Sequence, residues 1–361
     1  MFTRIRQGVG GFSNILSSPL PIESYLGLIS PLRSSTSIPA RIQGVILETP
    51  RAATVMLKAG PRWRGHRAGQ WVGVGVDING VRHRRSYSIT SVPSPQSGLI
   101  SITVQATPGG LVSNHLVRDA QVGDTLYLEP ASGDFVLPDN CQDPVLFITA
   151  GSGITPVMGI LRTMAATDGI GDVFLIHHAP DPTESIFSRE LSEMARRYSR
   201  FRYVEVFTRF PSRSVGNHIS ETRLDEMCPD WTKRSTWACG PTSLLCALTQ
   251  AWETRVKDRP LNLERFTLAR TENLEVQGGR VRFIKSAIEA VSDGRSPLLH
   301  VAESAGLIPP SGCRMGICHT CDSRLVSGTV RDLRDGRTQC DPGDRVQICV
   351  SVAAGDVELE V

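Results

Sequence analysis

The chain has 361 residues, of which 40% are hydrophobic and 21% are charged, and its formal net charge is +3 at pH 7. This length suggests two or three domains, because one domain usually takes ~100 to 200 residues. The ordinary composition excludes wholesale disorder, and the small net charge gives no reason to expect a nucleic acid as partner. No stretch offers ~20 uninterrupted apolar residues and no signal-peptide core follows the N-terminus, so we expect a cytoplasmic protein without a membrane span.

The first part of the chain has the pattern of an extension followed by a β-barrel. Residues 1–39 are rich in Ser, Pro and Leu, and we interpret them as an N-terminal extension with one short helix around residues 22–32. Residues 40–138 contain short β-like runs separated by turn signals, which predict an antiparallel barrel. The expected strands are 41–49, 53–59, 71–77, 81–90, 100–107, 125–129 and 135–137. Asn79-Gly80 predicts a tight hairpin between two of them.

The pattern changes near residue 139, where strands begin to alternate with helices. The expected strands are 145–149, 173–177, 203–208 and 236–239, and the expected helices are 156–166, 188–198 and 242–256. This alternation predicts a parallel sheet in an α/β domain over residues 139–258. We expect a linker at 259–275 and a third domain at 276–361, with strands at 281–284 and 346–350 around a group of cysteines.

Three of the nine cysteines crowd into one short segment of the third domain. Cys313, Cys318 and Cys321 have the spacing C-x4-C-x2-C, and Cys349 follows farther along the chain. That first spacing, with a distant fourth thiolate, is typical of a plant-type [2Fe-2S] cluster. We prefer Cys349 over Cys340 as the fourth ligand, because Cys349 lies in an alternating apolar run and Cys340 in a turn-rich stretch. A zinc-stabilised regulatory protein is the alternative, although zinc sites usually have two C-x2-C pairs and only one is present.

Two patterns in the predicted barrel suit a flavin nucleotide. Arg85, Tyr87 and Ser88 offer a phosphate clamp, a ring to stack on an isoalloxazine and a hydroxyl for its polar edge. A glycine-rich turn that opens a helix is a natural site for a pyrophosphate, and here it consists of Gly109, Gly110, Leu111, Val112 and Ser113. Taken singly, the patterns also fit a solvated strand face and a plain helix start.

Two further patterns suit a nicotinamide dinucleotide. A turn between an apolar strand and a helix contains Gly151, Gly153, Thr155 and Pro156, but it lacks the third glycine of G-x-G-x-x-G. A later strand ends in Cys239, Gly240 and Pro241, where the cysteine taken alone would be a buried packing residue.

The choice between NADH and NADPH depends on residues at or just after the ends of the predicted strands 173–177 and 203–208. Asp181 could bind a ribose 2′-hydroxyl and favour NADH. Thr208 and Arg209, with Arg213 close by, offer the hydroxyl and the cation that a 2′-phosphate needs. We prefer NADPH, because a guanidinium matches a phosphate better than a bare diol.

In this order, the motifs resemble the ferredoxin-reductase-like flavoprotein reductases that carry a C-terminal plant-type ferredoxin domain. The resemblance covers residues 40–361 and implies a FAD-binding β-barrel, an NAD(P)-binding α/β domain and a β-grasp [2Fe-2S] domain. It implies that Arg85 binds flavin phosphate, that Tyr87 packs on the ring, and that Ser88, Thr155 and Cys239 align the flavin and nicotinamide rings for hydride transfer. The aromatic residue that stacks on the flavin in stand-alone members has no expected counterpart, because a ferredoxin domain follows.

The resemblance implies an NAD(P)H:acceptor oxidoreductase. A nicotinamide gives up two electrons and a cluster takes one, and a flavin can do both. The whole pattern, including His115 and residues 133–137, is most similar to reductases that supply a fatty-acyl desaturase. The expected acceptor is a di-iron membrane desaturase or hydroxylase, and residues 1–39 could rest on the inner face of its membrane. The alternatives are the reductase component of an aromatic-ring, alkane or steroid hydroxylase and a passive iron–sulfur relay subunit.

Overall fold

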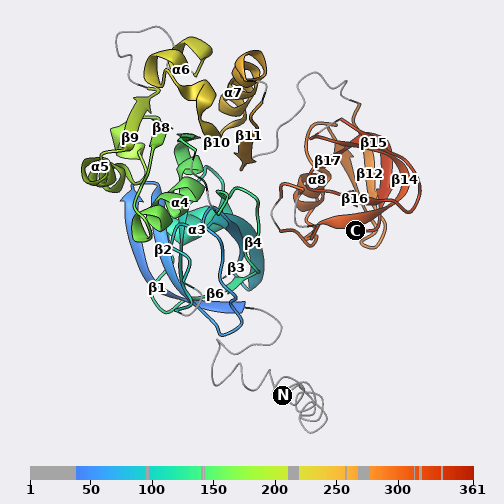
Figure 1. Ribbon diagram of the computed structural model, residues 1–361. Coiled ribbons are helices and arrows are strands. Elements are labelled where there is room, and N and C mark those ends of the chain that lie inside the picture. The colour runs from blue at the N-terminus through green and yellow to red at the C-terminus, as the bar shows by residue number, and fades with distance from the viewer. Residues whose placement is uncertain are drawn as a thin grey trace, which may run out of the picture.

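The computed structural model describes residues 38–361 with gaps, and these fall into three parts (Figure 1). The gaps are residues 95–96, 140, 142, 210–218, 257, 267–276, 313, 317–318 and 335. The helix predicted around residues 22–32 lies outside the described residues. Among those that are described, none of the helices combines the length and the apolar character needed to cross a membrane.

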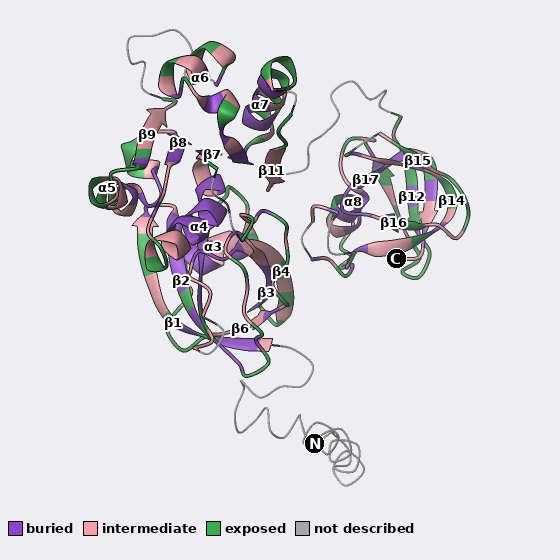
Figure 2. Ribbon diagram, viewed as in Figure 1, coloured by how far each residue is buried: buried purple, intermediate pink, exposed green. Residues whose placement is uncertain are grey.

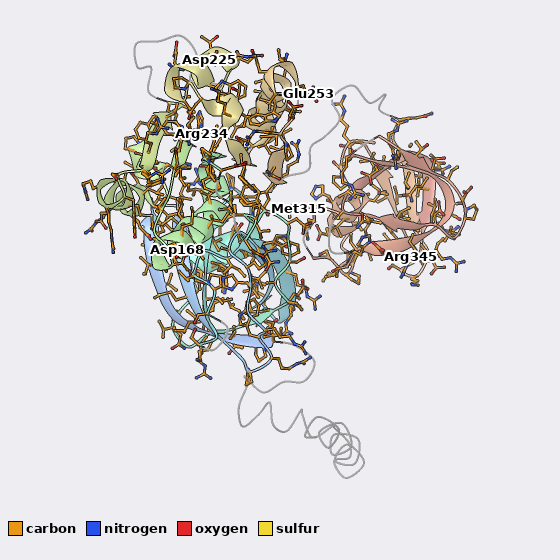
Figure 3. All side chains as sticks on the ribbon, viewed as in Figure 1. Asp168, Asp225, Arg234, Glu253, Met315 and Arg345 are labelled. Atoms are coloured by element: carbon orange, nitrogen blue, oxygen red, sulfur yellow. The ribbon has the colours of Figure 1, made fainter. Side chains whose placement is uncertain are left out.

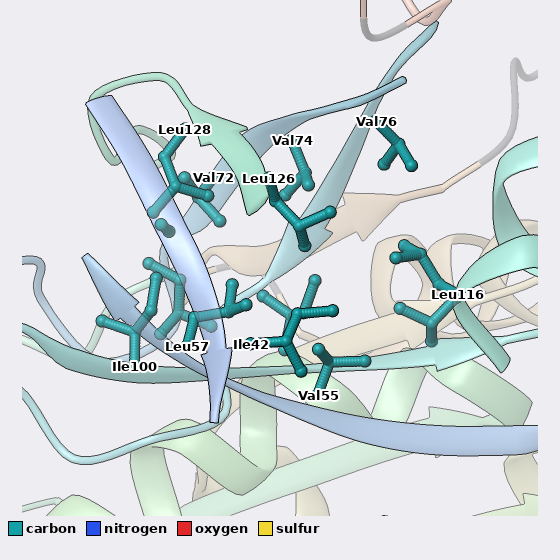
Figure 4. Packing of buried hydrophobic residues seen from close by; sticks show 14 of the residues in the cluster. Ile42, Val55, Leu57, Val72, Val74, Val76, Ile100, Leu116, Leu126 and Leu128 are labelled. Carbon is teal, nitrogen blue, oxygen red and sulfur yellow. The ribbon is translucent and has the colours of Figure 1, made fainter. Parts of the chain in front are cut away.

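The first part is an antiparallel β-barrel. Its strands are β1 (Ile38–Thr49), β2 (Ala52–Ala59), β3 (Trp71–Ile78), β4 (Val81–Ser88), β5 (Leu99–Gln105) and β6 (Thr125–Leu128). The strand order is β4-β3-β6-β1-β2-β5, and a bridge from Ile89 to Ile102 joins the edges and closes the sheet. The predicted hairpin joins β3 to β4, and Asn79 and Gly80 both have the positive φ that a type I′ turn requires. Helix α3 (Leu111–Arg118) packs Leu116 against the apolar interior of this barrel (Figure 4).

The strand predicted at residues 135–137 does not form. The N–H of Val136 donates to the carbonyl of Asp134 at 2.8 Å, so this backbone makes a tight local turn in place of a strand ladder. Phe135 is buried in the core of the second part, together with Ile160 of that domain. The apolar run therefore packs between two domains. Its sequence resembles that of a strand because a segment packed in this way also buries alternate side chains.

The second part is a parallel sheet covered on both faces. Its strands are β7 (Val145–Ala150), β8 (Val173–Ala179), β9 (Phe201–Phe207), β10 (Ser235–Gly240) and β11 (Leu261–Arg265), in the order β11-β10-β7-β8-β9. One face carries α4 (Ile154–Ala166) and α5 (Ser188–Arg197), and the other carries α6 (Glu221–Met227) and α7 (Thr242–Arg255). The strand order reverses between β7 and β10, so the loops that follow these two strands open a crevice at their carboxyl ends.

In the second part, the sequence pattern predicts neither α6 nor β11. β11 lies inside the range 259–275 that we expected to be a linker, yet all five of its residues pair in parallel with β10. This strand therefore completes the parallel sheet of the second part.

The third part is a small mixed sheet with one short helix. Its strands are β12 (Gly279–Phe283), β13 (Ile288–Ser292), β14 (Asp322–Asp332), β15 (Thr338–Gln339), β16 (Arg345–Gln347) and β17 (Ser351–Leu359). The order is β13-β12-β17-β14-β15, β16 pairs with β14, and α8 (Leu298–Ser304) contributes to the core. The strand predicted at 346–350 ends at Gln347, because the N–H of Val350 turns back to the carbonyl of Gln347 at 3.0 Å.

Each of the three parts has its own buried interior (Figure 2). The predicted fold class, an antiparallel barrel followed by a parallel α/β domain and a small α+β domain, is confirmed.

Candidate active site

A cavity of about 240 Å³ lies where the three domains meet. It brings together both predicted flavin patterns, part of the glycine turn after β7 and the cysteine-rich loop, whereas Cys239, Gly240 and Pro241 are not among its walls. Its walls include Tyr87, Ser88, Ser152, Thr155, Phe266 and Met315. Figure 3 shows Met315 on the side of the third domain that faces the other two. The sequence motifs that lie far apart in the chain therefore share one small space.

Ser88 and Tyr87 give this cavity a polar and an apolar wall. Ser88 is only 3% exposed, and its Oγ has no hydrogen-bond partner among the described residues. A buried hydroxyl in that state costs stability, which a ligand atom bound to it would recover. Burial raises the pKa of Tyr87, so its phenol stays neutral and offers a ring face. Both residues fit the edge and the face of a flavin ring.

Arg85 carries a positive charge without a carboxylate partner among the described residues. Its Nη1 donates to the carbonyl of Arg84 at 2.6 Å. Burial, followed by the nearby charge of Arg314, lowers the pKa of Arg85, so the surroundings disfavour this cation. A bound phosphate would remove that penalty, and the side chain therefore fits its predicted role.

The glycine-rich turn lies beside Arg85 in the same cavity wall. Gly109 has a φ of 70°, and a Cβ on Gly110 would lie 2.3 Å from Oγ1 of Thr107. The helix that follows begins at Leu111 and buries Val112, while the Oγ of Ser113 lies 3.2 Å from Oγ1 of Thr107. The residues from Gly110 to Ser113 line the cavity, so the start of α3 faces a space in which an anion could be bound.

On the nicotinamide side, the turn after β7 packs directly against the end of β10. Gly151 has a φ of 53°, and the chain passes through a short 3-10 turn into α4. Pro156 occupies the first turn of α4, where no backbone N–H is needed. Thr155 is buried and its Oγ1 donates to the carbonyl of Ser152 at 2.9 Å. A Cβ on Gly153 would lie 2.1 Å from the carbonyl oxygen of Cys239.

Cys239 lies at the carboxyl end of β10, and Gly240 and Pro241 lead from it into α7. Burial raises the pKa of the Cys239 thiol well above its usual range, so this sulfur stays protonated. Its register partner on β11 is Glu264. Burial raises the pKa of Glu264 to about 8, and its Oε2 has no hydrogen-bond partner among the described residues.

Glu264 and Phe266 are site residues that the sequence reasoning missed. A second cavity of about 810 Å³ is lined by both of them and also by Ser88 and Met315. We expected no counterpart of the C-terminal aromatic residue of stand-alone members, yet Phe266 follows β11 directly and lines both cavities. The alternation of Leu261 and Leu263 is the signal that could have revealed the strand.

The two alternative nicotinamide determinants contact each other. Nη1 of Arg209 lies 3.4 Å from Oδ2 of Asp181, and the Arg209 N–H donates to the carbonyl of Pro180. Hydrogen bonds from Thr183, with a contribution from Arg209, lower the pKa of Asp181. Thr208 is next to this pair, and Arg213 lies outside the described residues.

The cluster site is described in part, because Cys313 and Cys318 lie outside the described residues. Cys321 and Cys349 are both buried in the third core. Cys321 directly precedes Asp322 and Cys349 lies two residues after Gln347. Asp322 pairs with Gln347, so the β14–β16 pairing brings the two cysteines near each other. Cys340 is exposed and follows β15, which pairs with the far end of β14, roughly 25 Å along that strand. This geometry supports Cys349 over Cys340 as the partner of Cys321.

Arg334 fixes the loop between these cysteines and was not anticipated. Its Nη1 donates to the carbonyl of Gly316 at 2.8 Å, and its Nη2 donates to Oε1 of Gln347 at 2.9 Å. Gly316 has a φ of 71°, and a Cβ there would lie 2.5 Å from the guanidinium. One side chain therefore ties the loop to the strand that precedes Cys349.

Three family models match successive parts of the chain. They are the oxidoreductase FAD-binding domain at residues 50–137, the oxidoreductase NAD-binding domain at 147–250 and the 2Fe-2S iron-sulfur cluster binding domain at 284–354. These matches fall on the barrel, the parallel sheet and the mixed sheet in turn.

The chain is also similar to known proteins over most of its length. A "NADPH oxidoreductase" of Mycobacterium tuberculosis is 39% identical over 351 residues, which cover 96% of this chain and 90% of the relative. The glycine betaine monooxygenase reductase subunit of Chromohalobacter salexigens is 32% identical and covers 81% of this chain and 87% of its own. The structure of phthalate dioxygenase reductase matches with a TM-score of 0.63 at 21% identity, over 90% of this chain and 98% of that one.

Proposed function

The chain belongs to the family of NAD(P)H oxidoreductases with FAD-binding, NAD-binding and [2Fe-2S] domains, and we propose that it takes electrons from NADPH and delivers them singly to an oxygenase-type acceptor. The observation that carries this proposal is the shared cavity. Its walls combine the flavin motif, the nicotinamide turn and the loop between the cluster cysteines. A protein that used only a flavin, only a nicotinamide or only a cluster would not need all three sets of residues at one place.

Residues at different positions in the site would bind different parts of the two nucleotides. When bound, a flavin exchanges two electrons with a nicotinamide and single electrons with an iron–sulfur cluster. Arg85 and the turn from Gly109 to Ser113 would hold the flavin phosphates, and Tyr87 and Ser88 would hold the ring and its polar edge. Gly151, Gly153, Thr155 and Pro156 would hold the nicotinamide nucleotide, with Cys239, Gly240 and Pro241 bordering its ring.

The neutral forms of the Cys239 and Glu264 side chains suit the proposed transfer of electrons from the nicotinamide to the flavin. Burial raises both pKa values, so at neutral pH neither side chain places a full negative charge beside the ring site. Phe266 adds an apolar wall at the same place, which limits the access of water to the reacting ring. Cys313, Cys318, Cys321 and Cys349 would ligate the cluster.

NADPH is the proposed donor because Arg209 and Thr208 stand together at the end of β9. The guanidinium lies near the surface with Asp181 as its partner, and a 2′-phosphate could take the place of that carboxylate. The 39% identical relative carries the name NADPH oxidoreductase, which agrees with this choice.

For the acceptor, we propose a di-iron fatty-acyl desaturase at the membrane, as the motif pattern suggests. The printed names of relatives support the broader class, since they include reductase components of glycine betaine and 3-ketosteroid monooxygenases. A steroid or aromatic-ring hydroxylase is therefore the second candidate. The basic and apolar residues of the segment 1–39 provide the sequence argument for an acceptor at a membrane.

One experiment tests the reductase activity and the identity of the acceptor separately. The purified protein is first given NADPH or NADH with ferricyanide, and it is then combined with a di-iron desaturase or with a ring hydroxylase. We expect rapid ferricyanide reduction and product from the desaturase. Product from the hydroxylase alone would exclude the desaturase and leave the reductase intact. Failure to reduce ferricyanide with either nucleotide would support the passive relay subunit instead.

A further inference from the structure

A larger cavity of about 760 Å³ lies between the flavin domain and the ferredoxin domain. On the flavin side it is lined by β4 and by the turn at Gly109–Leu111. On the ferredoxin side it is lined by α8, by residues 307–311 and by Arg314 of the cysteine-rich loop. Both domains are needed to form it.

This cavity continues the flavin cavity at its phosphate end. Arg85, Gly110 and Leu111 line both of them. The smaller cavity contains the ring-binding side chains Tyr87 and Ser88, whereas the larger one begins where the flavin phosphate would be held. A nucleotide that extends beyond its first phosphate would therefore enter the space between the domains.

The charges of the larger cavity suit a pyrophosphate. Most of its cations already have partners, since Arg82 pairs with Asp77 at 2.7 Å and Arg84 pairs with Glu129 at 3.4 Å. Arg85 has no such partner among the described residues. Arg314 pairs with Glu303, but its buried Nε has no hydrogen-bond partner within the described part of the chain. One free cation and one free donor thus remain for a ligand.

The cavity also has an apolar mouth to which both domains contribute. Leu111 of the flavin domain is 47% exposed, and Ile308 of the ferredoxin domain is 74% exposed. Both side chains line this cavity. Exposed apolar side chains of this size at a mouth suit a flat heterocycle with an apolar face, and adenine is such a group.

We propose that the adenosine half of FAD is held between the two domains, so that the ferredoxin domain forms part of the FAD site and the cofactor joins the domains. This inference rests on the proposed function only in taking FAD as the flavin. It explains why a dinucleotide would be preferred over FMN, because FMN ends at the phosphate and would leave the interdomain cavity unfilled.

The test uses the full chain with its cluster intact and its flavin removed. FAD and FMN are titrated separately, and binding is followed by flavin fluorescence. The variant Ile308→Asp places a carboxylate at the cavity mouth without disturbing a core. We expect it to weaken FAD binding about tenfold, through lost apolar contact and repulsion of the pyrophosphate, with FMN binding unchanged.

Val291 provides the matched control. It is another branched apolar residue of the ferredoxin domain, it is 81% exposed, and it does not line the cavity. Val291→Asp is expected to leave the binding of both flavins unchanged. A second measurement is the hydrogen exchange of α8, which we expect FAD to slow and FMN to leave unchanged.

Two results would overturn the inference. One is equal binding of FAD by Ile308→Asp and the original chain, and the other is an equal loss of FAD and FMN binding. Neither would disprove the reductase, which ferricyanide reduction by the untreated protein tests independently. If that reduction fails while Ile308→Asp still weakens only FAD binding, the adenosine site stands and the proposed function falls.

Discussion

Gly153 and Cys239 lie so close that a Cβ on the glycine would be 2.1 Å from the cysteine's carbonyl oxygen. Because a backbone atom is in the way, no side-chain rotation can relieve the clash. We expect Gly153→Ala to lower the free energy of unfolding by about 1–3 kcal/mol and to raise the KM for NADPH. Denaturant unfolding and steady-state kinetics would measure the two effects.

Gly171 is the matched control for this substitution, since a Cβ there would have no atom within 4 Å. Gly171→Ala should therefore change neither quantity. Equal behaviour of the two alanine variants would show that the close approach of the turn to β10 is unimportant for nicotinamide binding.

Glu264 should make stability depend on pH in an unusual direction. Burial raises its pKa to about 8 in the folded chain, while the unfolded value lies near 4.5. The folded state therefore holds a proton that the unfolded state has lost, so its stabilising contribution is complete below pH 4.5 and disappears as pH rises through 8. The slope cannot exceed about 1.4 kcal/mol per pH unit for one proton.

Glu264→Gln removes this titration while it keeps the shape of the side chain. Between pH 5 and pH 8.5 the apparent melting temperature of the variant should fall less than that of the original chain. Parallel curves for the two proteins would mean that Glu264 titrates normally and that its surroundings are wetter than the structure indicates.

Arg209 should decide which nicotinamide nucleotide is used. Arg209→Ala removes the cation proposed for the 2′-phosphate, so the KM for NADPH should rise about tenfold or more while the KM for NADH changes little. Asp181→Asn removes the carboxylate that now holds this guanidinium and should lower the KM for NADPH. Arg189, which is exposed on α5, provides the alanine control. If both KM values rise together in Arg209→Ala, the residue has no role in selectivity.

The fourth cluster ligand can be tested with two serine substitutions. Cys349→Ser should abolish the iron and sulfide content and the visible absorption of the ferredoxin domain, because plant-type clusters need four thiolates. Cys340→Ser should leave all three unchanged, since that residue is exposed at the far end of β14. The reverse result would transfer the ligand assignment to Cys340, and zinc in the original chain would favour the regulatory alternative.

The domain order and most strands could be predicted from the sequence because alternation and glycine turns are local signals. The predicted hairpin at Asn79 is an example, since two adjacent residues determine it. Phe135 was misassigned because its partners lie on another domain. The contact between Asp181 and Arg209 joins the ends of two strands, so neither residue reveals the other in the sequence. Glu264 was missed because its short strand follows Pro260, a residue that usually ends regular structure.

Met315 gives the proposed flavin cavity a wall that belongs to the ferredoxin domain. A chain cut before β12 would keep both nucleotide motifs but would leave this side of the cavity open to water and dioxygen. The ferredoxin domain is therefore a poor candidate for simple exchange in engineered fusions. A replacement ferredoxin would have to carry a side chain of similar size at this point of its cysteine-rich loop, or the chimera would be expected to lose electrons to dioxygen as peroxide.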